Sequence, residues 1–474
     1  MTAPPRLTLL DAMFNERPVK LRLPFRFGVV TLREAPQLFV RARIRMADGR
    51  EGDGVAAELL VPKWFDKSLE LTNEDNFNQL RRAAALARRR MMNFGRDTAF
   101  GLSAAADAEH RLECGRENLN GLVASFGLAL MERAIIDALA RIEEVPAIEL
   151  LRRNALGLTD ALTPDLQGFD LDRFLASLAP ADFIFARHTV GLLDSLTRAE
   201  TAGKRLDDGL PESLEEVIAL YGQRYFKLKV GGKADADIER LAQIAAVLDQ
   251  IDEPYAVTLD GNEQYEEVDS VIELWRRIAE DNRLRRLKTS MLLLEQPITR
   301  SRALSEPIHN LARDVPVEVD ESDSDFGVFL QARALGYRGI SAKSCKGFYR
   351  ALLNRARVAK YNKDGGDYFM SAEDLTTQAG VAVQQDLALA MLIGAKHVER
   401  NGHHYVDGMA GAPQAEQDAF VTAHGDLYRR AANGRARLHI QNGAISLRSI
   451  AKATGLATAV MPAWEAMKLS PTAE

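Results

Sequence analysis

Five charged residues lie at or near the ends of short apolar runs, at regular intervals, in the second half of the sequence. They are Lys229 in YFKLKV, Asp260 in TLD, Glu295 in LLLE, Asp320 in VEVD and Lys343 in GISAK. Steps of 31, 35, 25 and 23 residues separate them, each long enough for a strand, a helix and two loops. In a (β/α)₈ barrel the carboxyl ends of successive strands converge on one mouth. The spacing therefore predicts a barrel with these five side chains at its mouth.

The bulk properties exclude several classes of protein. At 474 residues the chain is longer than one ordinary core. A net charge of -6, with no block of Lys and Arg, does not favour binding to nucleic acid or to an anionic membrane. The opening residues have no apolar run long enough for a signal peptide or a membrane span. Cys114 and Cys345 alone form neither a disulfide framework nor a zinc ribbon, so we expect a cytoplasmic protein.

The N-terminal third shows strands followed by helices rather than alternation. Val40–Met46 alternates apolar and charged residues before a turn at Asp48-Gly49, and helical periodicity follows further along. This order predicts a separate α+β domain over residues 1–180. We expect the C-terminal segment, residues 406–474, to pack back on that domain.

From residue 181 to residue 405 the pattern changes to alternating strands and amphipathic segments, which predicts an α/β fold, a modified (β/α)₈ barrel. The short apolar runs within it suit strands that are buried on both faces. The eight expected strands are Phe183–Leu192, Tyr225–Val230, Tyr255–Asp260, Met291–Gln296, Pro316–Asp320, Gly339–Ala342, Asp367–Ser371 and Lys396–Arg400.

Asp260, Glu295 and Asp320 supply hard oxygen ligands without any accompanying His or Cys. Such a set favours Mg²⁺, or else Mn²⁺, over zinc. A single acid at a strand end more often caps the next helix. Three acids in consecutive units, bracketed by two lysines, favour a metal site instead. Asn262 and Glu321 would orient the ligands, and Glu321 is an alternative to Asp320 as the third ligand.

Lys227 and Lys229 are two residues apart on one expected strand, so their side chains share a face. A neighbouring ammonium lowers the pKa of a lysine by disfavouring its charged form. We therefore expect Lys229, nearer the mouth, to act as a general base. Lys227 would add positive potential and contact a substrate carboxylate. Lys343 lies on the sixth strand, across the barrel from the second, so the two amines could approach a carbon from opposite faces.

Taken together, these motifs resemble the enolase superfamily, and more narrowly its muconate-lactonising branch within the mandelate racemase/muconate lactonising family. The match consists of K-x-K, D-x-N, E-Q-P, D-E-S and the lysine of AKSCKG, and it spans residues 225–347. The resemblance implies an N-terminal α+β capping domain over the barrel and Mg²⁺ held by the three carboxylates. It also implies proton abstraction α to a carboxylate to give an enediolate, with Lys229 and Lys343 as the acid/base pair.

The sequence departs from the pattern of two branches of the superfamily, which narrows the choice of branch. The mandelate-racemase branch carries a histidine at the end of strand seven, where this chain reads FMSAEDLTT. Dipeptide epimerases carry Asp-x-Asp near strand eight, where this chain reads HVERNGHH. The chain is also longer than a typical member, with extra length over residues 65–180.

Substrate specificity is expected in two loops of the capping domain and at the last two barrel strands. LPFRFG and VPKWFDK lie where the family has its substrate-covering loops, so Phe25, Arg26 and Trp64 are candidate substrate contacts. Packing beneath a lid is the alternative for each. Glu373 and Glu399 at strands seven and eight could meet a polar substrate group or cap a helix.

The sequence thus predicts a Mg²⁺-dependent isomerase or lyase that acts on a small carboxylate. Racemisation or epimerisation, cycloisomerisation and elimination all stay open. A sugar-acid dehydratase is the alternative within the superfamily, and a non-catalytic barrel used as a binding module is the alternative outside enzymes. The complete ligand and lysine sets argue against the module. We expect no nucleic-acid or membrane partner, and a homo-oligomer, since similar proteins are commonly dimers or octamers.

Overall fold

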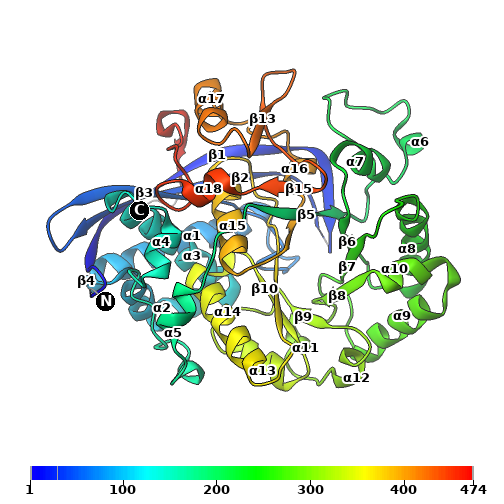
Figure 1. Ribbon diagram of the computed structural model, residues 1–474, viewed down its shortest axis with the longest axis horizontal. Helices are drawn as coiled ribbons and strands as arrows, with labels where there is room; N and C mark the ends of the chain where they lie inside the picture. Colours follow the sequence, from blue (N-terminus) through cyan, green and yellow to red (C-terminus); the bar gives the residue numbers. More distant parts are fainter. Residues whose placement is uncertain (1–2, 29, 472–474) are drawn as a thin grey trace.

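The computed structural model describes residues 3–28 and 30–471, and it opens with an antiparallel sheet covered by helices (Figure 1). The sheet has the order β16-β1-β2-β3, with β4 also paired to β1. Its strands are β1 (Leu7–Phe27), β2 (Val30–Met46), β3 (Glu51–Leu59), β4 (Arg96–Asp97) and β16 (Lys468–Leu469).

Helices α1 (Asn73–Phe94), α2 (Ala99–Arg116) and α3 (Gly121–Ile142) pack against one another, and α3 also packs against β3. A Cβ at Gly54 in β3 would lie 2.2 Å from the carbonyl oxygen of Ala134, so only glycine allows α3 to approach so closely. The connection to the barrel contains α4 (Ala147–Arg152), η1 (Pro164–Leu166) and α5 (Leu171–Ala176).

Eight parallel strands then form the barrel, in the order β11-β10-β9-β8-β7-β6-β5-β12. The predicted fold class, an α/β barrel preceded by an α+β domain, is confirmed. No backbone ladder joins β11 to β12 among the described residues; instead the backbone N–H of Asp374 donates to Glu399 Oε2 at 3.0 Å. The strands are β5 (Phe183–Val190), β6 (Tyr225–Lys229), β7 (Ala256–Asp260), β8 (Met291–Glu295), β9 (Val317–Val319), β10 (Gly339–Ala342), β11 (Phe369–Ala372) and β12 (His397–Arg400).

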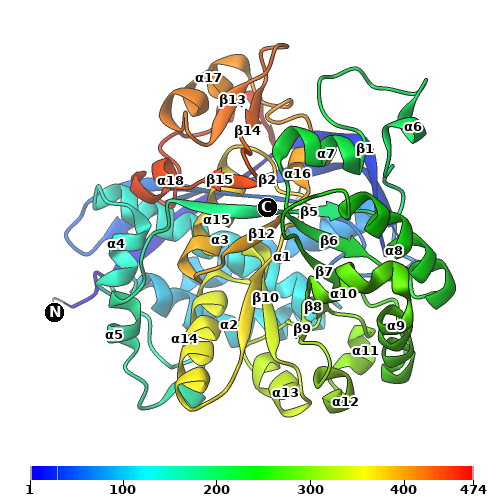
Figure 2. The same cartoon turned by 45° about the vertical axis from the view of Figure 1, so that its right-hand side comes forward.

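Helices surround these strands, and Figure 2 shows α8, α9, α13 and α14 on the outside of the barrel. Every residue of α15 is buried, because this helix also packs against the N-terminal sheet, where Gln385 Nε2 donates to the carbonyl oxygen of Val55 at 2.7 Å. The helices and 3₁₀ turns are α6 (Arg198–Thr201), α7 (Leu214–Tyr221), α8 (Ala234–Leu248), α9 (Val268–Glu280), η2 (Asn282–Leu284), α10 (Arg285–Thr289), α11 (Arg300–Ala303), α12 (His309–Ala312), α13 (Val328–Ala334), η3 (Ser344–Lys346), α14 (Phe348–Lys363), α15 (Val381–Leu392) and α16 (Gly402–Tyr405).

The last part of the chain contacts both the barrel and the N-terminal sheet. β15 pairs antiparallel with the start of β5, and β16 pairs with the middle of β1. In residues 3–28 and 30–471 no helix is both long enough and apolar enough to span a bilayer. The domain boundaries that the sequence predicts near residues 180 and 405 stay a proposal. The remaining elements are α17 (Gln414–Ala423), β13 (Tyr428–Arg430), β14 (Ala436–Leu438), β15 (Ala444–Ser446), α18 (Arg448–Lys452) and η4 (Trp464–Ala466).

Candidate active site

The five strand-end residues singled out in the sequence lie together at the carboxyl end of the barrel. Lys229, Asp260 and Glu295 are the last residues of β6, β7 and β8, and they are successive register partners. Asp320 and Lys343 follow β9 and β10 directly. All five are buried. Lys229 forms an ion pair with Asp260, and Lys343 forms one with Asp320.

Lys227 lies deeper and has four carboxylate partners. Its Nζ is 2.9 Å from Asp260, 2.7 Å from Glu295, 2.8 Å from Glu373 and 3.0 Å from Glu399. Burial lowers the pKa of Lys227, but the carboxylates outweigh burial and hold it well above its ordinary value. Lys227 is therefore a fixed positive charge at the base of the site.

Ion pairing also acts on Lys343. Burial lowers its pKa, the charge of Asp320 raises it, and the net shift is upward. Burial raises the pKa of Asp320, whereas Lys343 and Lys346 lower it. The effect of the lysines is larger, so the pKa of Asp320 lies below its ordinary value. In this arrangement Lys343 is an ammonium, so abstracting a proton first requires release from Asp320.

The three predicted metal ligands are neighbours, but lysine ammonium groups lie between them. Lys227 bridges Asp260 and Glu295, and Lys343 Nζ lies 3.9 Å from Glu295. Over residues 3–28 and 30–471, the acidic trio with oxygens within 4.8 Å of one another is Glu295, Glu318 and Glu373, not the predicted trio. Burial, Asp260 and Glu373 together raise the pKa of Glu295.

Asn262 contacts both the predicted ligand Asp260 and Glu321. The backbone N–H of Asn262 donates to Asp260 Oδ1 at 2.8 Å, and its Nδ2 donates to Glu321 Oε1 at 3.1 Å. Gln296 has a part that the sequence motif alone did not reveal: its Oε1 accepts from the backbone N–H of Asp320 at 2.9 Å. Gln296 thus fixes the loop after β9 from the end of β8.

Lys346 is a second residue that sequence reasoning missed. Its Nζ donates to Asp320 Oδ1 at 3.2 Å and to Ser341 Oγ at 2.8 Å, while Ser341 Oγ donates to Asp320 Oδ1 at 2.5 Å. The signal was present in AKSCKG, but the η3 turn is what returns Lys346 to the same carboxylate as Lys343.

The two glutamates of strands seven and eight occupy different positions. Glu373 forms ion pairs with Arg187 and Lys227 in the barrel interior and does not line the pocket at the mouth. These buried cations hold Glu373, and its contact with a substrate stays a prediction. Glu399 does line the pocket, and it accepts a hydrogen bond from Thr189 Oγ1 at 2.6 Å. Arg187 and Thr189 carried no local sequence signal.

A pocket of only about 20 Å³ lies above these charges. Phe25 and Trp64 line it as expected, and the Trp64 ring centroid lies 4.8 Å from Lys343 Nζ. Arg26 does not line it, because strand alternation turns Phe25 and Phe27 inward and leaves Arg26 exposed, so its substrate contact stays a prediction. The lining residues are Phe25, Phe27, Val61, Trp64, Lys227, Lys229, Asn262, Lys343, Asp374, Leu375, Thr376, Glu399 and Asn401.

Barrel loops fasten the segment at residues 61–67 over this pocket. Arg300 donates to the carbonyl oxygens of Trp64 and Phe65, each at 2.9 Å. Lys67 forms an ion pair with Glu263 and donates to the carbonyl oxygen of Asn262 at 2.8 Å. These contacts close the segment onto the barrel, which accounts for the small volume beneath it.

No protein-family model and no curated protein matches the chain. Solved structures do match. An enolase from Bradyrhizobium, complexed with magnesium and mandelic acid, is 16% identical with a TM-score of 0.59, covering 99% of this chain and 100% of its own. A dipeptide epimerase from Enterococcus faecalis, complexed with Mg and L-Leu-L-Tyr, is 13% identical with a TM-score of 0.57, covering 92% and 99%. Muconate lactonizing enzyme from Pseudomonas fluorescens, complexed with muconolactone, is 17% identical with a TM-score of 0.55, covering 98% and 98%. The chain therefore has the fold of the enolase superfamily.

Proposed function

We propose that this chain is a Mg²⁺-dependent enzyme of the enolase superfamily that removes a proton α to the carboxylate of a small substrate. The observation that supports this most is the arrangement at the mouth. Two buried lysines, Lys229 on β6 and Lys343 after β10, both line one small pocket next to buried acids. Strands two and six of an eight-stranded barrel lie across from each other, so the amines would face a bound carbon from two sides.

The acids at the mouth fit a divalent cation. Asp260, Glu295 and Asp320 are fully buried oxygen donors, a set that suits Mg²⁺ better than zinc. Glu321 Oε2 is buried and has no hydrogen-bond partner among the described residues, and a cation or its bound water would satisfy it. Mn²⁺ is the second choice. When bound, the ion would stabilise negative charge on the enolised carboxylate.

Each residue of the site would then have its own role in the reaction. Asp260 and Asp320, engaged as ligands, would release Lys229 and Lys343 from the ion pairs that now hold them. Lys229 would take the α-proton from one face, and Lys343 would give or take a proton on the other. Lys227, held by four carboxylates, would keep its positive charge without exchanging a proton. Phe25, Phe27 and Trp64 would exclude water and contact the apolar part of the substrate.

This chemistry is common to racemisation or epimerisation, cycloisomerisation and elimination, and the proposal includes all three. Two observations bear on the alternatives. Glu373 and Asp374 follow β11 where the dehydratase-type histidine would lie, which disfavours a sugar-acid dehydratase. A non-catalytic binding module has no need for two lysines facing one small pocket.

The decisive experiment follows solvent deuterium into the α-carbon of small carboxylates by mass spectrometry. A library of α-hydroxy, α-amino and N-acylamino acids is incubated with the protein in D₂O, with added Mg²⁺ or with a chelator. We expect Mg²⁺-dependent deuterium uptake for at least one substrate class. Uptake that is equal with chelator would contradict the metal mechanism, and turnover in which the α-hydrogen is neither exchanged nor lost would contradict the lysine mechanism.

A further inference from the structure

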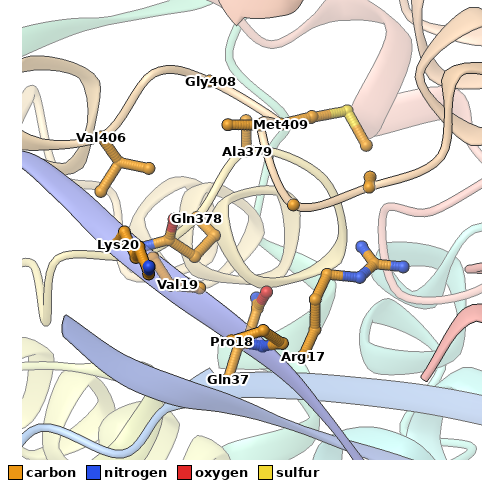
Figure 3. A pocket seen from close by; sticks show the side chains of 13 residues that line it. Arg17, Pro18, Val19, Lys20, Gln37, Gln378, Ala379, Val406, Gly408 and Met409 are labelled. Atoms are coloured by element: carbon orange, nitrogen blue, oxygen red, sulfur yellow. The ribbon is translucent and has the colours of Figure 1, made fainter. Parts of the chain in front are cut away.

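The reaction pocket is too small for a carboxylate substrate. Its volume of about 20 Å³ holds about one water molecule. The larger cavity in Figure 3, of about 290 Å³, lies between residues 17–20 of β1 and residues 408–412, and it shares no lining residue with the reaction pocket. A substrate therefore fits beside the lysines only when a segment that covers the reaction pocket moves.

Glu263 connects one such segment, residues 61–67, to the barrel. Glu263 is the third residue after the end of β7, and its side chain is buried. Its carboxylate forms an ion pair with Lys67 of the covering segment and accepts from Nε and Nη2 of Arg300, at 2.7 and 2.8 Å. The backbone N–H of Arg300, at the start of α11, donates to the same carboxylate at 2.8 Å. Glu263 thus contacts the covering segment directly and also orients Arg300.

Arg300 extends this connection to Trp64. Its Nη atoms donate to the carbonyl oxygens of Trp64 and Phe65, each at 2.9 Å, while Glu263 holds the same guanidinium. The centroid of the Trp64 ring lies 4.8 Å from Lys343 Nζ, within the range of a cation–π contact. The position of this ring over the candidate acid/base lysine therefore depends on Glu263.

The charges around Glu263 allow the covering segment to open without unfolding. Burial raises the pKa of Glu263, but Arg300 and Lys67 outweigh burial and lower it, so the carboxylate is charged at neutral pH. The side chains of Lys67 and Arg300 are 24% and 27% exposed, so water already reaches both cations. When the segment moves away, Arg300 can stay paired with Glu263 and water can replace the partner of Lys67. Opening then leaves no buried charge unpaired.

We propose that Glu263 is a positioning residue that fastens the covering segment over the reaction pocket, and that this segment opens to admit the substrate. In the closed state Glu263 holds Lys67 and Arg300, and Trp64 covers Lys343. In the open state Lys67 is hydrated and Trp64 has left Lys343. The role in substrate entry rests on the proposed function, whereas the fastening of the segment does not.

The fastening is tested without substrate, with a chelator present, by acrylamide quenching of Trp64 fluorescence. Trp275 and Trp464 are replaced by phenylalanine, so that Trp64 is the sole tryptophan. We expect Glu263→Gln to shift the balance from closed to open about tenfold, because hydrogen bonds to a charged group are lost. Quenching then increases, and the emission moves to longer wavelength. Glu267→Gln, which replaces an exposed glutamate paired with Arg302 at 3.4 Å, is the matched control and keeps the native quenching.

Lys67→Met tests the same contact from the side of the covering segment. This variant leaves Glu263 paired with Arg300, so it creates no unpaired buried carboxylate. We expect increased quenching here as well, and an effect in the double variant that is smaller than the sum of the single effects, because the two residues act as a pair. Urea unfolding establishes that each variant is folded. Native quenching in both single variants overturns the proposal, and additive effects overturn the pairing.

Substrate entry is tested by steady-state kinetics on the substrate found by deuterium exchange. We expect Glu263→Gln to raise KM and to keep kcat, because the covering segment binds the substrate while Lys229 and Lys343 stay in place. Glu267→Gln keeps both constants. Increased quenching with an unchanged KM overturns the role in entry but not the fastening. Increased quenching in a protein that takes up no deuterium from any substrate contradicts the proposed function, and with it the role in entry, while the fastening stands.

Discussion

The ion pairs of the charged residues differ between the two halves of the barrel. In the half formed by β6 to β10, each candidate acid/base lysine has one close carboxylate partner: Lys229 pairs with Asp260 and Lys343 with Asp320. In the half formed by β11, β12 and β5, the acids Glu373 and Glu399 converge on Lys227, which extends from β6 and also contacts Asp260 and Glu295. Arg187 of β5 also holds Glu373. A lysine with one partner can exchange it for another contact. A lysine with four buried partners cannot, so the first half suits proton transfer and the second half suits fixing the charge.

Replacing Lys227 should have the largest effect on the molecule. Lys227→Met leaves four buried carboxylates without their shared cation, and breaking a buried ion pair from one side costs about 3–5 kcal/mol. Urea unfolding measures this loss in the free energy of unfolding. Lys363→Met, on the exposed face of α14, serves as the control and should stay within about 0.5 kcal/mol of the native protein. Equal stability of the two variants would contradict the claim that the four carboxylates depend on Lys227 for their charge balance.

Replacing either single-partner lysine should instead spare the fold and abolish chemistry. In Lys229→Ala and Lys343→Ala we expect α-proton exchange to fall by about 10²–10⁴-fold, the usual loss on removing a general base. For a racemase or epimerase, each variant loses exchange from one stereoisomer and retains it from the other. For one-sided elimination, only Lys229→Ala loses exchange. Exchange at the native rate in both variants would exclude the lysines as bases.

Metal binding offers a test that does not depend on turnover. With Mg²⁺ at about 100 times its Kd, the native protein should gain about 2.7 kcal/mol in stability, visible as a rise in Tm. Asp260→Asn should lose this gain, whereas Asp364→Asn, at an exposed position after α14, should keep it.

Glu318→Gln distinguishes the two acidic trios. Glu318 belongs to the deeper trio with Glu295 and Glu373, where oxygens approach within 4.8 Å. We expect Glu318→Gln to retain the Mg²⁺-dependent rise in Tm. If it loses the rise while Asp260→Asn keeps it, the cation belongs to the deeper trio and the β6–β10 half is not the metal-binding half.

The smallest effect is expected at the lid. Arg26 is exposed beside two inward-facing phenylalanines, so Arg26→Ala should change KM by less than about twofold, as for an ordinary surface substitution. Phe27→Ala, which opens the apolar side of the pocket, should raise KM clearly. Steady-state kinetics on the substrate found by deuterium exchange compares the two. A larger effect at Arg26 would mean that the lid at residues 25–28 adopts another position during turnover.

The sequence by itself determined the barrel and the residues at the ends of β6 to β10. A parallel strand that is buried on both faces has a short apolar run as its sequence. The residue after that run lies at the mouth of the barrel, whatever the fold of the other segments. Asp260, Glu295 and Lys343 could therefore be located from their spacing alone. Gln296 and Lys346 were within the same motifs, but only the backbone turns after β8 and β10 show that both contact Asp320 or its loop.

The tertiary structure alone decided which charges are fixed and which face the pocket. Arg187 and Glu373 are 186 residues apart in the chain, and nothing local in either sequence segment marks them as partners. Phe25 and Arg26 are neighbours in one strand, and only the packing of β1 over the barrel decides that the phenylalanine points inward and the arginine outward. Local patterns set the period of a strand, but its phase against distant elements follows from long-range burial, because that is where apolar area is removed from water.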